Sequence, residues 1–385
     1  MRIGMCCDMY LPHVSGVTNH IKLYKKHYEE LGHEVYIFTF GDRDFVDDEP
    51  NVYRTHGIAW GDTGWNFSLN YSPEARELMA TMDVLHAHHP FQSGRLAASI
   101  AKKHHIPLLF TNHTRYDLYS DAYAALVPQG PRYATLRRYL KSFLDDCDCV
   151  IAPSRSIEHW LRTFIRCEHV TTVPNGINIG AFANPDPANA RSRGELGLRE
   201  DDFVLCYLGR VAPEKNTDYL FSEFFEATAS NDRLRLLVVG DGPELHAARL
   251  MAQTHEFGER IVFTGMQPYA ELPSYAALCD AFVTGSVSEV HPLVVLEAMA
   301  AGLPIVAVSS PGISDTVEQG RSGLLAKSPT PAALASEMIT ISTNAKLRDR
   351  LAQGARERIQ QYSFANTADR VLRFYEALLE QSNQQ

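Results

Sequence analysis

The sequence lacks the features of a membrane-spanning or secreted chain. It has no apolar run near the ~20 residues that a transmembrane helix needs, and its first residues, MRIGMCCDMYLP, contain no signal-peptide core. Its seven cysteines are an odd number without paired zinc spacing, and most lie in apolar, strand-like runs. We therefore expect free, buried thiols and a cytoplasmic location, at the inner face of the membrane if the protein attaches to lipid.

Basic residues are in the minority. Lys and Arg number 36 against 46 Asp and Glu, which gives a formal net charge of −10 and argues against a general nucleic-acid partner. The sequence has no Walker loop and no intact G-x-G-x-x-G, so neither a P-loop ATPase nor a common dehydrogenase is supported. Its 385 residues, 45% of them hydrophobic, are instead sufficient for two globular domains.

The first half begins with a strand–helix–strand pattern. Residues 2–7 and 34–40 are strand-like, and residues 17–31 between them have helical spacing. In such a unit the loop after the first strand lies at the carboxyl edge of the sheet, where ligands bind. Gly16 in this loop is a candidate for close backbone approach to a ligand phosphate, although simple turn formation explains it equally well. Residues 42–72, rich in Gly, Asp and Trp, are expected to form connecting hairpins or a lid.

The second half repeats the α/β pattern. Apolar runs predict strands at residues 203–208, 234–239, 261–264, 281–284 and 305–308. The first four lead into loops that contain glycine, as expected at the carboxyl edge of a nucleotide-binding sheet. Arg210 and Lys215 lie in the first of these loops, GRVAPEKN, where they are placed to bracket a diphosphate that many enzymes hold with a metal ion. Taken alone, such a pair is more often solvated than catalytic.

The stretch SVSEVHPLVVLEAMAAGLP places two glutamates around a helix start. Pro292 suits the first helical position, because its missing N–H costs nothing there. The free amides of Leu293 and Val294 would then face an anion at the helix mouth, with Glu289 in the loop and Glu297 about a turn further in. A ligand with a phosphate in the middle and hydroxyls at both ends, such as a nucleotide-sugar, fits this arrangement. The spacing alone is more typical of a solvated helix face.

These motifs together resemble the donor site of the family-4 retaining glycosyltransferases. Glu-x7-Glu closed by EAMAAGLPIVA matches the family signature, and G-R-x5-K-N stands at the expected separation before it. The resemblance covers nearly the full length and is clearest over residues 204–309. It implies an α/β GT-B fold, in which two Rossmann-like, doubly wound domains face each other across a cleft. We expect residues 1–178 to form the acceptor-side domain, joined by the C-terminal helix 364–385, and residues 179–363 to bind the nucleotide-sugar.

The resemblance implies a role for each residue of the donor site. Glu289 binds sugar hydroxyls, Glu297 binds the ribose, and the backbone of Met266 pairs with the base. The expected catalytic residues are His113, Arg210, Lys215 and Glu289, and the expected donor-binding residues are Gly16, Met266, His291, Pro292, Leu293, Val294 and Glu297. The family often has Gly-Phe-Gly after the first glutamate, whereas this chain has Val-His-Pro. Since proline has no N–H, the phosphate contact would come from Leu293 and Val294.

Histidines gather after two predicted strands of the first half, at 83–87 and 108–111, which lead into HAHHPF and NHTRYDLY. Four of them are suitable metal ligands: His86, His88, His89 and His113. No acid or cysteine accompanies them at ligand spacing, so no metal site is expected. The TxHT pattern instead resembles the family motif in which the histidine lies beside the reacting sugar, the role expected for His113. Here the chain is most similar to the bacterial diacylglycerol glucosyltransferases, which implies acceptor contacts from Tyr10, His89, Arg115 and Tyr116.

Residues 128–143, PQGPRYATLRRYLKSF, are the one strongly basic patch. Four basic residues alternate with apolar ones at helical spacing: Arg132, Arg137, Arg138 and Lys141. An ordinary surface helix packed on the sheet explains this pattern as well as a helix that attaches to anionic lipid headgroups, an attraction worth roughly 1 kcal/mol per basic residue.

We therefore predict a retaining, metal-independent hexosyltransferase that uses a UDP- or GDP-linked sugar as donor substrate and no cofactor. The expected acceptor is a membrane lipid such as diacylglycerol, and the alternatives within the same chemistry are a soluble glycan or a small polar molecule. From other classes, a nucleotide-sugar epimerase on the same fold and a binding module without turnover stay open. The expected partners are the donor, a lipid or sugar acceptor and anionic membrane, with no nucleic acid.

Overall fold

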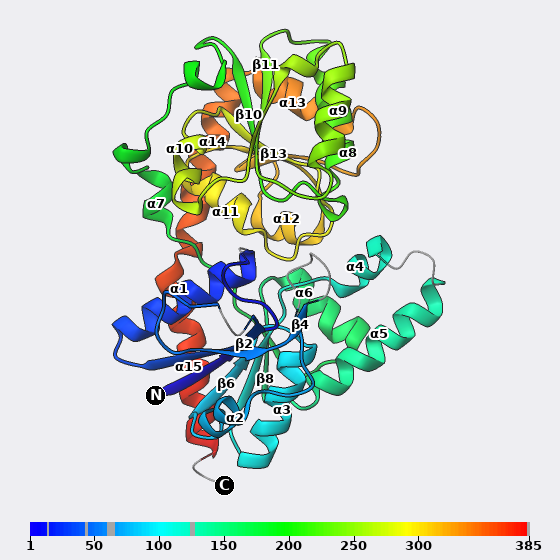
Figure 1. Ribbon diagram of the computed structural model, residues 1–385. Helices are drawn as coiled ribbons and strands as arrows, with labels where there is room; N and C mark the ends of the chain where they lie inside the picture. The colour runs from blue at the N-terminus through cyan, green and yellow to red at the C-terminus, as the bar shows by residue number, and fades with distance from the viewer. Residues whose placement is uncertain (14, 43–44, 60–65, 124–127, 383–385) are drawn as a thin grey trace. The chain divides into compact units, whose positions relative to one another are not determined.

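The computed structural model describes residues 1–13, 15–42, 45–59, 66–123 and 128–382. Its contacts divide the chain into two compact units. The first comprises Met1–Asp117, Ala125–Asn175 and Ala365–Gln385, and the second comprises Leu118–Ala124 and Gly176–Phe364. Each unit holds one large sheet covered by helices, the arrangement of a Rossmann-like domain (Figure 1).

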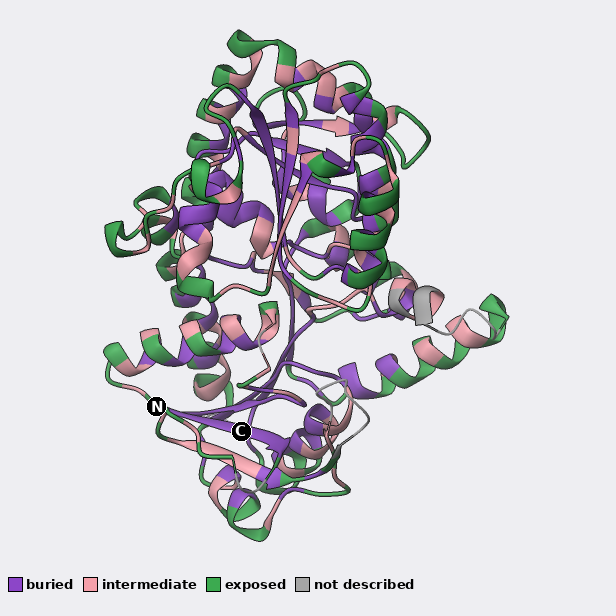
Figure 2. Cartoon of the chain, turned by 45° about the horizontal axis from the view of Figure 1, so that its top comes forward, coloured by how far each residue is buried: buried purple, intermediate pink, exposed green. Residues whose placement is uncertain are grey.

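The first unit is built on a parallel sheet of seven strands in the order β3-β2-β1-β6-β7-β8-β9. The strands are β1 (Arg2–Cys6), β2 (Glu34–Gly41), β3 (Val52–His56), β6 (Val84–Ala87), β7 (Leu108–Thr111), β8 (Cys149–Ala152) and β9 (Val170–Thr172). Its helices include α1 (Gly16–Glu30), α2 (Pro73–Met79), α3 (Gln92–His104), α5 (Gln129–Leu144), α6 (Arg155–Trp160) and α15 (Phe364–Ser382), and α4 (Tyr116–Tyr123) follows β7. The central strands β1, β6, β7 and β8 are almost completely buried, as the purple strands of Figure 2 show, and this burial explains their continuous apolar sequences.

The segment 42–72 differs from the sequence-based expectation. It was expected to be irregular apart from hairpins, but β3 extends the main sheet by pairing in parallel with β2. Arg54 holds this edge strand in place, because its guanidinium binds the Asp47 carboxylate at 2.6 Å and the Leu11 carbonyl at 2.7 Å. A hairpin does form next, between β4 (Ile58–Ala59) and β5 (Asn66–Phe67). Residues 43–44 and 60–65 of the same expectation lie outside the described ranges.

The C-terminal helix α15 packs on the first unit. The Tyr28 hydroxyl donates to the Ala368 carbonyl at 2.9 Å, and the Arg370 guanidinium donates to the Thr172 carbonyl at 2.9 Å. Tyr375 is fully buried, and its hydroxyl lies 2.6 Å from Nδ1 of His86 in β6. Through Ala368, Val371 and Tyr375, the helix α15 thus belongs to the same core as the first strands.

The second unit has a parallel sheet of six strands in the order β12-β11-β10-β13-β14-β15. The strands are β10 (Phe203–Leu208), β11 (Leu234–Val239), β12 (Ile261–Gly265), β13 (Ala281–Thr284), β14 (Ile305–Val308) and β15 (Gly323–Ala326). The helices include α7 (Ile179–Ala183), α8 (Thr217–Thr228), α9 (Leu245–Thr254), α10 (Leu272–Ala276), α11 (Leu293–Ala300), α12 (Pro311–Thr316), α13 (Ala333–Thr343) and α14 (Ala345–Ile359). All five strands predicted for this half are present.

Two hydrophobic cores lie on the two faces of this second sheet. Alternate residues of β10 point to opposite faces, so Leu205 joins one core and Cys206 joins the other. The first core includes residues of α8, α9 and α13, and the second includes residues of α10, α11 and α14. Helices on both faces leave only the two ends of the strands open to ligands.

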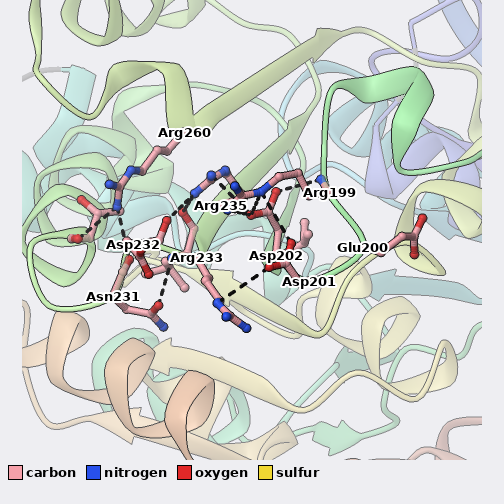
Figure 3. A network of polar contacts seen from close by, with 12 residues as sticks. Arg199, Glu200, Asp201, Asp202, Asn231, Asp232, Arg233, Arg235 and Arg260 are labelled. Carbon is pink, nitrogen blue, oxygen red and sulfur yellow. Dashed lines mark hydrogen bonds and ion pairs between the residues drawn. The ribbon is translucent and has the colours of Figure 1, made fainter.

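A network of charges closes the amino end of this sheet (Figure 3). Asp202, just before β10, accepts a hydrogen bond from the Arg199 amide at 2.8 Å and lies 3.3 Å from Nη2 of Arg235 in β11. The Arg235 side chain also donates to the Asp232 carbonyl at 2.9 Å. Since β10 and β11 run in parallel, their first residues are neighbours, and the network ties the two strands together at this edge.

Two expectations from composition can be compared with the structure. All seven cysteines are free and buried, as predicted. Burial raises the pKa of Cys149 to about 12, so this thiol stays protonated at neutral pH. None of the helices in the described ranges combines the length and the apolar content needed to cross a membrane.

Candidate active site

The strand order of the second unit points to its ligand site. The chain adds β11 and β12 on one side of β10 and then β13 to β15 on the other, so the loops after β10 and β13 part at the sheet's carboxyl edge. Ligands of open α/β sheets bind at such a switch point. Here Nζ of Lys215, after β10, lies 2.8 Å from Oε1 of Glu289, after β13. The fold therefore brings together two of the predicted catalytic residues.

Glycine and asparagine shape these loops. Gly240, at the end of β11, has a φ of +151°, and a Cβ there would stand 1.9 Å from the Gly209 carbonyl oxygen, so only glycine fits. Asn216 takes the left-handed conformation at φ 55° and donates through Nδ2 to the Gly285 carbonyl at 3.1 Å. The Ser288 hydroxyl donates to the Glu214 carbonyl at 2.7 Å. These hydrogen bonds fix the loops after β10 and β13 against each other at the switch point.

Arg210 presents a second cation from the same loop. Its side chain is half exposed and pairs with the carboxylate of Glu214, which is buried. The Tyr207 hydroxyl donates to the Arg210 carbonyl at 2.8 Å and so anchors the backbone. The loop thus offers Arg210 and Lys215 on one short turn, which suits an anion with more than one phosphate oxygen.

The helix α11 begins one residue later than predicted. Pro292 is its N-cap, with φ −73° and ψ 113°, rather than its first helical residue. The reason is that the Pro292 carbonyl already accepts from the Val295 amide at 3.1 Å. The amides of Leu293 and Val294 precede this first intrahelical bond, so they are the anion-facing groups of the helix start. His291 packs away into protein, with its ring centroid 5.2 Å from that of Tyr362, and burial lowers its pKa to about 4.

The two glutamates of the signature stand in different surroundings. Glu289 is held by its backbone, because its carbonyl accepts from the Gly312 amide at 3.2 Å. Glu297 is buried inside α11, and Oε1 accepts a hydrogen bond from the Tyr269 hydroxyl at 2.7 Å. Burial raises the pKa of Glu297 to about 7, while the bond from Tyr269 acts in the opposite direction. Glu297 is thus a carboxyl group that changes charge near neutral pH.

Tyr269 is a site residue that sequence reasoning missed. It follows the loop after β12, and the signal that could have found it is the place of this loop at the carboxyl edge beside the other glycine loops. Met266 lies at the start of the same loop with 67% of its surface exposed. Met266 thus directly follows β12, in the same loop as Tyr269, whose hydroxyl binds Glu297.

The first unit has a switch point of its own, between β1 and β6. The Asp8 amide, after β1, donates to Nδ1 of His89, after β6, at 3.1 Å. Oδ1 of Asp8 accepts from the Ser93 amide at 2.6 Å, which ties the start of α3 to the same point. Gly16 opens α1 after the cap Ser15, which accepts from the Thr18 amide at 3.2 Å. The loops predicted to carry ligand contacts therefore end at this edge.

A triad of histidines lies at this edge, and it is not the set considered from the sequence. Nδ1 of His88 is 3.0 Å from Nε2 of His113, and a ring nitrogen of each, together with one of His20 from α1, lies within 4.8 Å of the others. His86 instead binds Tyr375 and Thr111, and His89 binds Asp8. Burial lowers the pKa of His20 to about 3 and that of His113 well below its ordinary value, so the triad is neutral at pH 7. His20 was missed because no spacing links residues on separate elements.

The other predicted acceptor residues are scattered along this edge. Tyr10 is buried, and its hydroxyl donates to Oε2 of Glu49 at 3.2 Å. Arg115 makes a two-pronged pair with Asp117, at 2.8 and 2.7 Å. Tyr116 packs edge-on against Phe91, with 5.3 Å between ring centroids. The last contact joins the first residue of α4 to the N-cap of α3.

The match to known families decides the classification. The model described as Glycosyltransferase Family 4 matches residues 14–180, and the model described as Glycosyl transferases group 1 matches residues 189–358. The alpha-monoglucosyldiacylglycerol synthase of Streptococcus pneumoniae is 30% identical over 336 residues, which are 84% of this chain and 75% of that protein. The chain belongs to the family-4 glycosyltransferases.

Further relatives of this glycosyltransferase differ in what they are named for. The alpha-monoglucosyldiacylglycerol synthase of Acholeplasma laidlawii is 28% identical over 399 residues, covering 100% of this chain and 98% of that protein. A D-inositol 3-phosphate glycosyltransferase of Stackebrandtia nassauensis is 31% identical over 314 residues, covering 78% and 70%.

Solved structures resemble the glycosyltransferase over almost its whole length. Sucrose-phosphate synthase from Thermosynechococcus elongatus matches with a TM-score of 0.79 and 22% identity, covering 98% of this chain and 99% of that chain. Anabaena HepE in complex with UDP-glucose matches with a TM-score of 0.77 and 19% identity, covering 98% and 100%. At such identities the likeness concerns the fold, and it confirms the predicted GT-B architecture of two Rossmann-like domains.

Proposed function

We propose that this glycosyltransferase moves a hexose, most simply glucose, from a UDP- or GDP-sugar to the hydroxyl of a membrane lipid such as diacylglycerol, with retention of anomeric configuration and without a metal ion. The observation that supports it best is the Lys215–Glu289 contact at the switch point of the second unit, beside the start of α11. This arrangement suits a donor with a diphosphate in the middle and a sugar at one end.

Each donor group has a counterpart in the proposal. The cations of Arg210 and Lys215, with the amides of Leu293 and Val294, hold the diphosphate. Glu297 accepts hydrogen bonds from the ribose hydroxyls, and the backbone of Met266, a largely exposed residue, pairs with the base. Further donor contacts come from the loop before α1 through Gly16 and from the residues that precede α11.

The chemical step is a displacement at the anomeric carbon. The bond between this carbon and the diphosphate oxygen breaks while the acceptor oxygen bonds to the same face, and the acceptor's proton passes to the departing phosphate. Negative charge grows on the phosphate, so Arg210 and Lys215 bind the transition state more strongly than the ground state. Glu289 binds the sugar hydroxyls, and His113 orients the sugar as a neutral imidazole.

Metal independence rests on this positive charge. Two cations on one loop stabilise the negative charge of the diphosphate, as a divalent ion does in other glycosyltransferases. The triad of His20, His88 and His113 offers three neutral imidazoles at ligand distance, so the proposal has to be tested with chelators. We expect activity to survive EDTA, and strict dependence on added Mn²⁺ would contradict metal independence.

The lipid acceptor rests on the two synthases of similar sequence and on α5. Arg137 and Arg138 are exposed on this helix, whereas Leu140 and Phe143 are buried against the unit. The helix thus presents positive charge outward, as attraction to anionic headgroups requires. Sedimentation with vesicles should show binding that rises with anionic lipid and falls with salt, and Arg137→Glu with Arg138→Glu should abolish it. Lack of binding to any vesicle would favour a soluble acceptor.

A second candidate is the same chemistry on a small polar acceptor. It is favoured by the D-inositol 3-phosphate glycosyltransferases, which are about as similar in sequence as the lipid synthases. Product analysis separates the candidates, with nucleotide-sugars first ranked by thermal shift because tight binders stabilise by mass action. A glycolipid supports our proposal, and a soluble glycoside supports the second candidate. A changed free sugar would mean epimerisation. If no product forms with any acceptor, the protein is a binding module without turnover.

A further inference from the structure

The first unit has an open pocket that neither the donor site nor the histidine triad uses. It has a volume of about 360 Å³ and is lined by Phe67, Ser68, Leu69, Phe91, Gln92, Arg95, Leu96 and Tyr139. These residues come from β5 and the segment after it, from the N-cap and first half of α3, and from α5 (Figure 1). The volume falls within the range of small-molecule sites, at roughly 300–1,000 Å³.

The walls of this pocket are apolar and continue onto the surface. Leu69 is 85% exposed, Phe67 51% and Tyr139 38%, although side chains of this kind are usually covered. Ile58, which pairs with Phe67 across the β4–β5 hairpin, is 75% exposed. A rim of large apolar side chains at the mouth of an apolar pocket suits a hydrocarbon chain.

Two polar groups of the pocket are buried without a partner among the residues that the structure describes. They are Nε2 of Gln92 and Nε of Arg95, both hydrogen-bond donors. The far end of the Arg95 guanidinium is fixed, because Nη2 donates to the Ser142 hydroxyl at 2.8 Å and the group lies over the Tyr139 ring at 4.4 Å from its centroid. A buried donor without an acceptor is costly, so an acceptor oxygen placed beside Gln92 and Arg95 would stabilise both groups.

The pocket adjoins the edge where the acceptor residues were predicted. Phe91, in its wall, packs against Tyr116 on one side, with centroids 5.3 Å apart, and stacks with Tyr139 on the other, with centroids 6.1 Å apart. Arg137 and Arg138 directly precede Tyr139 in sequence and are exposed. Pocket, predicted acceptor edge and basic helix thus form one continuous part of the first unit.

We propose that this pocket binds an acyl chain of the lipid acceptor, with the ester carbonyl accepting hydrogen bonds from Gln92 and Arg95. This inference rests on the proposed lipid acceptor and goes further, because it assigns the part of the lipid that does not react. It makes acyl length and the ester group determinants of acceptor specificity. A dialkylglycerol, which has ether links and no carbonyls, should bind less well than the diacylglycerol of equal chain length.

The first test uses dioctanoylglycerol in mixed micelles, with transfer measured at saturating donor. Leu69→Gln at the rim and Leu96→Trp, which fills the pocket, should each raise the acceptor KM about tenfold, the loss expected when about two methylenes leave their contacts. The donor KM, measured in separate titrations at a fixed acceptor concentration, should be unchanged. The matched control is Leu31→Gln, which alters an exposed leucine of the same unit at the opposite edge of the sheet. If Leu69→Gln and Leu96→Trp behave like Leu31→Gln while transfer persists, the pocket proposal is wrong and the proposed function stands.

The second test asks for the carbonyl contact. Wild-type protein should prefer diacyl over dialkyl acceptor, and Gln92→Leu should reduce this preference without weakening the binding of the dialkyl lipid. A purely structural role of Gln92 would weaken both lipids equally, which would overturn the assigned hydrogen bond. Direct titration of donor-free protein with dioctanoylglycerol gives a readout independent of turnover. If no diacylglycerol binds or reacts while a soluble acceptor is glycosylated, the lipid acceptor itself fails and the pocket proposal with it.

Discussion

The two edges of the sheet in the second unit both carry paired charges, but they differ in how those charges are held. At the amino edge, the Asp202 side chain is 1% exposed and is bound by the Arg199 amide and the Arg235 guanidinium (Figure 3). At the carboxyl edge, the Lys215 and Glu289 side chains are 27% and 11% exposed and lie between glycine-bearing loops at the switch point. Both edges pair acidic with basic side chains, but Asp202 is almost inaccessible to solvent, whereas Lys215 and Glu289 are partly exposed.

Strand direction explains the difference. Helices that connect parallel strands start at the carboxyl edge, so their free amides and the diverging loops gather there. At the amino edge the charged side chains pair with one another and form hydrogen bonds with nearby backbone groups, so they tie neighbouring strands together. A pair of opposite charges therefore indicates a ligand site only when its place in the topology leaves it facing an open switch point. Four predictions test this contrast, from the largest expected effect to the smallest.

Lys215→Ala should lower the turnover number by about 100-fold or more, in line with the loss of one preorganised charge. The matched control at the other edge is Arg235→Ala, which should leave the turnover of the folded enzyme unchanged. Steady-state kinetics with a saturating acceptor measures both. If Lys215→Ala keeps full activity, the charged pair at the carboxyl edge is no more functional than the pair at the amino edge.

Asp202→Ala should lower the free energy of unfolding by about 2 kcal/mol, because it leaves the Arg235 guanidinium, only 17% exposed, without its carboxylate. Its neighbour Asp201 is 57% exposed and provides the control, since Asp201→Ala should cost less than about 0.5 kcal/mol. Urea denaturation gives both values. Equal stability of the two variants would mean that the amino-edge network is not structural.

Glu297→Ala should raise the donor KM about tenfold and leave the turnover number within about twofold, because a ribose contact is similar in the ground and transition states. Glu289→Ala should lower turnover as well, since the sugar changes shape during transfer. The comparison requires donor titrations of both variants at saturating acceptor. An unchanged donor KM in Glu297→Ala would contradict the ribose contact.

The donor KM should fall a few-fold as the pH rises from 6 to 8. With its pKa raised to about 7, Glu297 is mostly protonated at pH 6 and mostly ionised at pH 8. Only the ionised carboxylate can accept hydrogen bonds from ribose hydroxyls at both of its oxygens. Glu297→Gln should show a flat profile over this window. If the donor KM of the wild-type protein is equally independent of pH, Glu297 does not contribute to donor binding through its charge.

Much of the local structure could be predicted without coordinates. The strands at 203–208, 281–284 and 305–308 match β10, β13 and β14 in both bounds, because a short apolar run bounded by turn residues has few other solutions in a parallel sheet. The signature from Glu289 to Glu297 is also local, since it lies on one loop and one helix. β3 could not be predicted, because a polar edge strand such as VYRTH has no continuous apolar pattern.

The sequence by itself determined the fold class, five of the six strands of the second unit and the residues that belong to the family's donor motif. The tertiary structure decided which of these residues meet, and added Tyr269 beside Glu297, His20 beside His88 and His113, and the pocket in front of Gln92 and Arg95. The physical reason is that the period of apolar residues and the spacing of motif residues describe one helix, strand or loop at a time. Contacts between elements depend on strand order, which places the carboxyl ends of distant strands next to one another.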